Sequence, residues 1–141
     1  FIPKKLTIDL ETATFLQDLV QRIPESMNIL AAEVLMLFSN KAVSREDVTL
    51  ALKHVLLAKE SRYESYLSNF SSSEQSVLNQ LSRFGEIGFP QSKHFVSTTH
   101  LTSRSVGKIF EKLTRKGVIE KVDSRFRISD PLLSFYLKSF R

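Results

Sequence analysis

Residues 103–128 have the sequence SRSVGKIFEKLTRKGVIEKVDSRFRI, and this stretch decides the fold. Its first half carries apolar residues at helical spacing, and Gly117 ends that pattern because a left-handed backbone costs glycine nothing. Its second half alternates β-branched or aromatic residues with charged ones around a turn at residues 122–124. The stretch therefore predicts an amphipathic helix followed directly by a two-stranded hairpin near residues 118–128.

Two shorter helices are expected upstream, in SSSEQSVLNQLSRFG (71–85) and FPQSKHFVSTTH (89–100). Ser72 and Gln75 match a capping box at the start of the first of them. Few small folds combine two short helices, a third amphipathic helix and a β-ribbon within about 60 residues. We therefore expect a winged helix-turn-helix, in a second domain that spans residues 71–141 and ends in a further helix.

The third helix of this domain has two unlike faces. At about 100° per residue, Val106, Ile109, Phe110 and Leu113 fall on one arc, the face that a core would bury. Basic residues fall opposite, and a hydroxyl side chain at residue 102 or 103 is suited to cap the helix. The residues predicted to bind DNA are Thr102, Ser103, Arg104, Lys108, Lys112 and Arg115 on the helix, and Lys121, Arg125 and Arg127 on the hairpin.

The first half of the chain is expected to be all-helical, a small bundle over residues 1–70. Thr7 or Asp9 is suited to cap its first helix, and residues 27–38 are apolar nearly all round, which predicts a helix buried on several sides. Ser44 begins a capping signal for a long helix that continues to about Leu67. The fold class is therefore mainly α: a helical bundle followed by a winged helix with one hairpin.

Charge divides the chain in the same way. Residues 1–70 hold 8 Lys and Arg against 9 Asp and Glu, whereas residues 71–141 hold 12 against 6. The whole positive excess lies in the second half, which favours a nucleic-acid partner for that half. A basic surface is necessary for such a partner but is not sufficient, because solvated helix faces are often basic as well.

Other features exclude several classes of site. The chain has no cysteine, which rules out disulfides and thiolate zinc ligands, and it has neither a signal peptide nor an apolar run near the roughly 20 residues of a membrane span. His54, His94 and His100 are scattered, without metal-ligand spacing. We expect a cytoplasmic protein with no membrane partner, no metal site and no catalytic residue on this chain.

Three segments resemble the C-terminal region of P-loop AAA+-like ATPases of archaea and bacteria, relatives of the origin-recognition type. The most specific segment is FEKLTRKGVIEKVDSRFRISDPLLSFYLKSFR (110–141), where the hairpin runs directly into Asp130-Pro131-Leu132. RIPESMNILAAEVL (22–35) and VSREDVTLAL (43–52) are similar to the lid helices of these proteins. The resemblance covers nearly the whole chain and implies a lid-like bundle followed by a winged helix.

The resemblance also implies that a preceding part of a longer protein holds ATP and Mg²⁺. The chain itself has no phosphate-binding loop, since its only Gly-Lys pair, Gly107-Lys108, lies inside a predicted helix and is followed by isoleucine. AAA+ lids often send an arginine to the nucleotide from a turn, and the corresponding turn here is RIPES (22–26). Arg22 is the candidate nucleotide contact, although the glycine and arginine typical of that turn are absent.

Several functions are compatible with these patterns. In the first, the chain is the DNA-binding C-terminal region of an ATPase, with its third helix in the major groove and its hairpin on phosphates. In the second, the winged helix recognises a protein or regulates the ATPase domain of the same chain. In the third, the chain is a free-standing transcription regulator. An exposed aromatic surface on the last helix, at Phe135, Tyr136 and Phe140, would favour a protein partner.

Overall fold

The computed structural model describes residues 6–141 and divides the chain into two compact units, residues 1–60 and residues 61–141. The sequence places the domain boundary after residue 70. The structure places it ten residues earlier, so the helix before residue 70 belongs to the second unit. The two units are described separately below.

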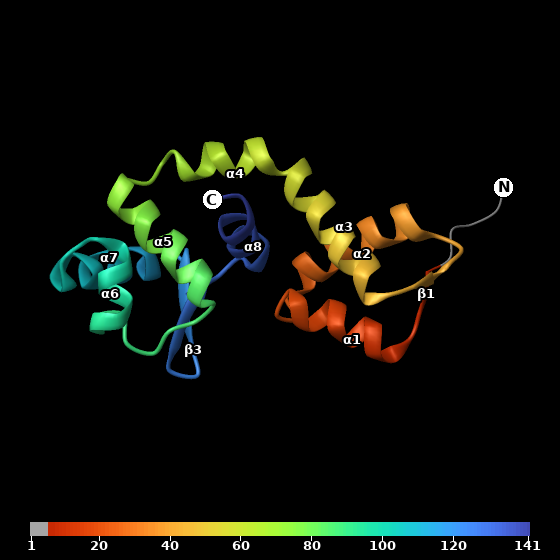
Figure 1. The fold of residues 1–141 in the computed structure, drawn as a ribbon, viewed down its shortest axis with the longest axis horizontal. Coiled ribbons are helices and arrows are strands. Elements are labelled where there is room, and N and C mark those ends of the chain that lie inside the picture. The colour runs from red at the N-terminus through yellow and green to blue at the C-terminus, as the bar shows by residue number, and fades with distance from the viewer. Residues whose placement is uncertain (1–5) are drawn as a thin grey trace. The chain divides into compact units, whose positions relative to one another are not determined.

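The first unit packs three helices together with a short strand pair (Figure 1). Its elements are β1 (Thr7–Ile8), α1 (Leu10–Leu19), α2 (Pro24–Phe38), β2 (Ala42–Val43) and α3 (Arg45–Ala58). The expectation of an all-helical first half is wrong in one respect, because β1 and β2 pair in parallel. Each strand is only two residues long, which is too short to show an alternating pattern in the sequence.

Side-chain caps define where the helices of this unit begin. The carboxylate of Asp9 accepts from the backbone N–H of Thr12 at 2.7 Å, so Asp9 rather than Thr7 caps α1. Ser44 and Asp47 form a reciprocal capping box at the start of α3. The long helix expected to reach Leu67 is interrupted at Lys59, where φ of −98° and ψ of 1° leave the helical range. A separate helix, α4 (Glu60–Leu67), follows the interruption.

Helix α2 is less buried than its composition predicts. Its buried residues, Ser26, Leu30 and Val34, form one stripe at four-residue spacing. Met36 is 66% exposed and Leu37 is 38% exposed, so the expectation of burial on several sides is wrong. Within this unit α2 contacts α1 and α3, and two neighbouring helices cover one side of a helix only.

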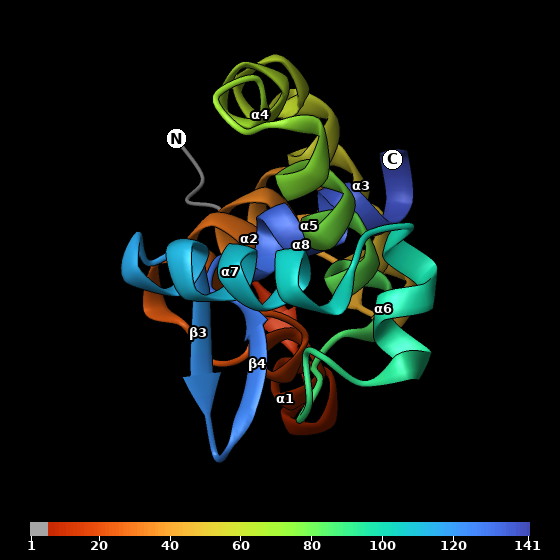
Figure 2. The same cartoon turned by 90° about the vertical axis from the view of Figure 1, so that its left-hand side faces the viewer.

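The second unit has the order of elements that the sequence predicts for a winged helix. Figure 2 looks onto α7, with the hairpin extending from one end of that helix and α6 near the other. The elements are α4, α5 (Ser72–Phe84), α6 (Lys93–Thr99), α7 (Ser103–Arg115), β3 (Ile119–Val122), β4 (Arg125–Ile128) and α8 (Pro131–Phe140). The predicted hairpin is confirmed, with β3 and β4 antiparallel and Ile119 opposite Ile128.

The hairpin turn has two residues, not three. Asp123 and Ser124 have φ of 51° and 64°, whereas Val122, which the sequence analysis assigns to the turn, pairs with Arg125 in the ladder. Positive φ at both central residues is the backbone of a type I′ turn, whose twist matches that of the flanking strands. Phe126 of β4 also forms an isolated antiparallel β-bridge with Ile87, which connects the loop after α5 to the hairpin.

The cap of α5 lies one residue earlier than expected. The hydroxyl of Ser71 accepts from the backbone N–H of Glu74, and the Glu74 carboxylate accepts from the backbone N–H of Ser71 at 2.8 Å. Three consecutive serines leave the register of such a box ambiguous in sequence. The acidic partner in the structure is Glu74, whereas the expected pair was Ser72 with Gln75.

A row of phenylalanine rings joins the elements of the second unit. The ring of Phe95 meets those of Phe84 and Phe110 edge to face, with centroids 5.3 Å and 5.7 Å apart, and Phe110 meets Phe126 at 5.4 Å. Edge-to-face pairs stabilise beyond the area that they bury. The row connects α5, α6, α7 and β4, so it fixes how α7 sits against the hairpin.

Replacing Phe110 with alanine is expected to lower the free energy of unfolding by roughly 3–5 kcal/mol, because it removes a buried ring and two aromatic contacts. Urea unfolding followed by circular dichroism measures the change. Phe89→Ala is the matched control, since that ring is 81% exposed and its loss should change stability by less than about 0.5 kcal/mol. Equal effects of the two substitutions would contradict the role given to Phe110.

Candidate nucleic-acid interface

The N-terminus of α7 is fixed by Thr102. Its hydroxyl accepts from the backbone N–H of Ser105 at 3.1 Å and lies 2.9 Å from the Ser105 hydroxyl. Thr102 is therefore the cap, and Ser103, the alternative cap in the sequence analysis, is the first residue of the helix. The hydroxyl of Thr102 is engaged in holding the helix, whereas Ser103 is exposed at its first turn.

Opposite faces of α7 differ in burial as the sequence predicts. Val106, Phe110 and Leu113 are buried, and Ile109 is half-buried. Arg104, Lys108 and Arg115 are exposed and, within the described part of the chain, form no salt bridge. The structure therefore brings together three of the nine predicted contacts as unpaired cations on one helix face.

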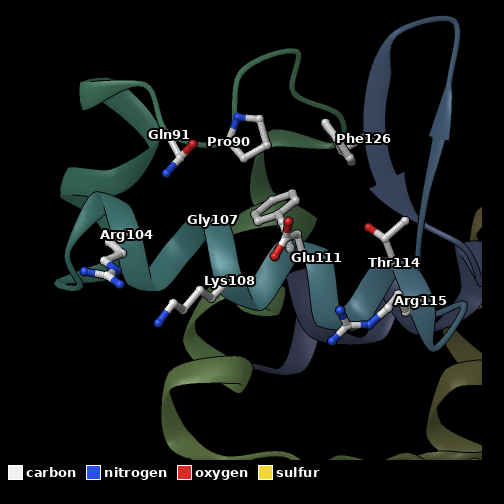
Figure 3. Close-up of a pocket in the computed structure, with 10 residues that line it drawn as sticks. Pro90, Gln91, Arg104, Gly107, Lys108, Glu111, Thr114, Arg115 and Phe126 are labelled. Carbon is white, nitrogen blue, oxygen red and sulfur yellow. The ribbon is translucent and has the colours of Figure 1, made fainter.

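These three cations line a hollow of about 660 Å³ along the exposed face of α7 (Figure 3). Loop residues before α6 and the hairpin residue Phe126 form its other walls. The remaining lining residues are Pro90, Gln91, Gly107, Phe110, Glu111 and Thr114. Sequence reasoning missed Pro90, Gln91 and Phe126, since they come from other elements and carry no periodic signal.

Lys112 differs from the other cations of α7. Its Nζ lies 2.9 Å from Oε2 of Glu74, whose side chain is only 8% exposed. Lys112 is predicted from the sequence to belong to the basic face, but in the structure it is directed toward Glu74 of α5. Its charge is therefore neutralised by a partner inside the protein, and it joins α7 to the capping box of α5.

Acidic residues also pair with two of the three predicted cations of the hairpin. Arg125 Nε lies 3.0 Å from Glu86 Oε1, and its Nη2 donates to the Glu86 carbonyl at 3.2 Å. Arg127 lies directly across the ladder from Glu120 and pairs with it at 2.8 Å. Lys121 places its Nζ 5.3 Å from the centroid of the Phe126 ring. Lys121 is therefore the predicted hairpin cation without an acidic partner in residues 6–141.

Arg22, the candidate nucleotide contact, lies in the first unit and is held locally. Its Nε lies 2.9 Å from Asp18 Oδ1, and its Nη1 donates to Gln17 at 3.3 Å. The backbone at Arg22 has φ of 55°, a left-handed conformation shared with Gln21. The guanidinium thus folds back onto α1 and remains exposed to solvent.

Residues 6–141 contain neither a cluster of metal-binding side chains nor a membrane-spanning helix. No group of three or more His, Asp or Glu side chains is placed to hold a metal ion. Every helix in this range is too short or too polar to span a membrane. His94 packs edge to face on Phe84, with ring centroids 5.3 Å apart, which accounts for it as a packing residue.

Residues 61–139, more than half of the 141-residue chain, match the family model described as a probable winged helix domain. The matched range agrees with the second compact unit. No curated protein and no solved structure matches the chain.

The Glu74–Lys112 pair is expected to give stability that depends on pH. The Ser71 backbone N–H and the Lys112 ammonium group hold the pKa of the Glu74 carboxyl below its ordinary value, and burial opposes them in part. A carboxyl with a lowered folded-state pKa stabilises the fold above its unfolded pKa, near 4.3, and this stability is lost as the pH falls through the folded pKa. Glu74→Gln should therefore lower the free energy of unfolding by about 1–2 kcal/mol at pH 7, and by progressively less as the pH falls through the folded-state pKa of Glu74.

Chemical denaturation at pH 7 and pH 3 measures this difference. Glu111→Gln is the matched control, because Glu111 is exposed on α7 and forms no salt bridge within residues 6–141. If Glu74→Gln lowered the free energy of unfolding by the same amount at both pH values, the charge of Glu74 would make no contribution to stability.

Proposed function

The chain belongs to the family of probable winged helix domains, and from that fold and the basic face of α7 we propose that it binds duplex DNA. In helix-turn-helix proteins the second helix of the motif enters the major groove, and here that helix is α7. The groove of B-DNA is about 12 Å wide and admits an α-helix.

The observation that carries the proposal is the set of unpaired cations at Arg104, Lys108 and Arg115. Elsewhere in this unit, Lys112, Arg125 and Arg127 each have an acidic partner within 3.0 Å. A cation without an internal partner is available to neutralise a phosphate, and each such contact releases counterions from DNA. Arg104 lies in the first turn of α7, the part of the helix from which base edges are reached.

The hairpin is proposed to contact phosphates beside the groove through Lys121. Arg125 and Arg127 instead act within the protein, since their guanidinium groups already pair with Glu86 and Glu120. This assigns phosphate binding to Lys108, Arg115 and Lys121, and leaves Arg104 in the first turn of α7, from which base edges are reached. This assignment retains four of the nine residues that the sequence predicts to bind DNA.

We further propose that the first unit is the lid of an AAA+-like ATPase whose nucleotide-binding domain carries ATP and Mg²⁺. The resemblance of residues 22–35 and 43–52 to lid helices supports this proposal. So does the exposed apolar side of α2, with Met36 and Leu37, which is suited to contact another domain. Arg22 is a weak nucleotide ligand in this arrangement, because Asp18 already pairs with it.

The alternative proposal is that the winged helix binds a protein. Of the three aromatic residues of α8, Tyr136 is buried against Tyr63, Phe135 is half-buried, and Phe140, which stacks on Tyr136, is 38% exposed. Two exposed rings favour this alternative: Phe140, and Phe89 in the loop before α6, which is 81% exposed. A cytoplasmic location and a role as a free-standing transcription regulator are both compatible with DNA binding and stay open.

Removing Lys108 and Arg115 together is expected to weaken DNA binding and its dependence on salt. The logarithm of affinity falls with the logarithm of salt by about 0.9 per phosphate contact, so Lys108→Ala with Arg115→Ala should reduce the slope by about 1 to 2. Fluorescence anisotropy with a labelled duplex measures this slope between about 50 and 300 mM salt. Over this range, contacts between cations and phosphates become increasingly screened.

The matched control removes two exposed lysines, Lys53 on α3 and Lys138 on α8, and so makes the same change in net charge. It should leave the slope within error of the native value. Absence of any duplex binding at low salt would overturn the DNA proposal, as would equal slopes for the native chain and the Lys108 and Arg115 double variant.

The isolated 141-residue chain is expected not to bind ATP, because it has no glycine-rich loop whose backbone N–H groups could hold phosphates. Calorimetric titration with ATP and Mg²⁺ should give only the heat of dilution. A titration with duplex DNA in the same buffer shows that the sample is competent to bind. Micromolar affinity for ATP would contradict this expectation.

A further inference from the structure

Gly107 occupies an unusual place in the middle of α7. Glycine within a helix is less favourable than alanine by about 1 kcal/mol, so its presence calls for a structural reason. A Cβ at residue 107 would lie 2.6 Å from Nε2 and 2.9 Å from Cδ of Gln91. The missing side chain thus leaves the space that the Gln91 amide occupies against the helix.

The Gln91 side chain is held in that space by a hydrogen bond. Its Nε2 donates to the backbone carbonyl of Ser103 at 3.0 Å, in the first turn of α7. Figure 3 shows the amide directed toward the helix near Gly107, on the side where the hollow opens. Gln91 comes from the loop between α5 and α6, yet its amide lies beside residues of α7.

The backbone that carries Gln91 is itself anchored. The Ser92 hydroxyl caps α6 by accepting from the backbone N–H of Phe95, and the Ser92 N–H donates to the carbonyl of Phe89 at 3.1 Å. Phe95 is fully buried in the row of aromatic rings. An amide attached to a fixed backbone and bonded to a helix carbonyl is preorganised, which is the condition for specific recognition.

The hydrogen bond to Ser103 uses one of the four hydrogen-bonding positions of the amide. One N–H and the carbonyl oxygen Oε1 remain, on an exposed residue whose neighbours in the hollow include Arg104 and Lys108. The remaining groups, one donor and one acceptor, complement adenine in the major groove, where N7 accepts and the N6 amino group donates. A phosphate group offers only hydrogen-bond acceptors, so it would pair with the N–H of the amide but not with Oε1.

We propose that Gln91 is a specificity-determining residue that recognises an adenine, and that the absence of a side chain at Gly107 allows the Gln91 amide to reach the face of α7. The inference rests on the proposed binding of duplex DNA. Lys108 and Arg115 supply affinity through phosphates, whereas Gln91 selects sequence.

The test is selection of bound duplexes from a pool with a randomised central segment, followed by sequencing, with the native 141-residue chain and three variants. The native chain should enrich an adenine at one position of the site. Gln91→Ala removes the amide, and Gly107→Ala places a methyl group against it; both should lose that adenine. Affinity for the selected site should fall by about 5- to 150-fold in each, because a bidentate base contact discriminates by about 1–3 kcal/mol.

Gln17→Ala is the matched control, an identical change in the first unit, and should keep the adenine. Gly107→Ala also separates a loss of recognition from a loss of folding. Alanine favours helix, so this variant should melt at no lower temperature than the native chain. On a duplex without the site, the dependence of affinity on salt should be unchanged in all variants. If Gln91 only held α7 in place, Gln91→Ala would change this dependence as well.

Two results overturn the inference while leaving the proposed function intact: binding with a salt slope but no enriched adenine, or an adenine that persists in Gln91→Ala. An adenine that persists only in Gly107→Ala overturns the role given to the glycine. Absence of duplex binding by the native chain at low salt overturns the proposed function and this inference together.

Discussion

Burial of one apolar stripe of α7 is the constraint on which the interface depends. Val106, Phe110 and Leu113 are buried, and the Phe110 ring touches Phe95 of α6 and Phe126 of β4. Because a helix is rigid, burying one stripe fixes the direction of every other side chain on it. The solvent-facing positions of Arg104, Lys108 and Arg115 are therefore a consequence of how the core packs.

Acidic neighbours then decide which of the cations remain available. Lys112 lies on the same helix as Lys108, but it meets the nearly buried carboxylate of Glu74 and becomes part of the packing between α7 and α5. Arg125 meets Glu86, which belongs to a different part of the chain. A cation held this way would have to leave its partner before it could bind a phosphate, and that exchange yields little net free energy.

The loop before α6 adds to α7 a chemical group that the helix itself lacks. Helix residues on the hollow supply cations, one carboxylate at Glu111 and one hydroxyl at Thr114. Gln91 brings an amide with both a donor and an acceptor, and the gap at Gly107 lets it lie against the helix backbone. In the proposed complex with DNA, affinity and sequence selection therefore come from different elements that the core holds together.

The sequence by itself determined the order of elements from α5 to α8, since hydrophobic periodicity and turn residues are local. The helix face, the Gly117 stop and the hairpin all follow from residues a few positions apart. It did not determine the break at Lys59, the two-residue ladder of β1 with β2, or the exposure of Met36, which depend on what each segment packs against. Nor did it determine the site in full, because the pairs Lys112–Glu74 and Arg125–Glu86 and the contact of Gln91 with α7 join residues 12 to 39 positions apart. Only the folded chain brings such residues within hydrogen-bonding distance, so tertiary structure decided which cations are free to bind.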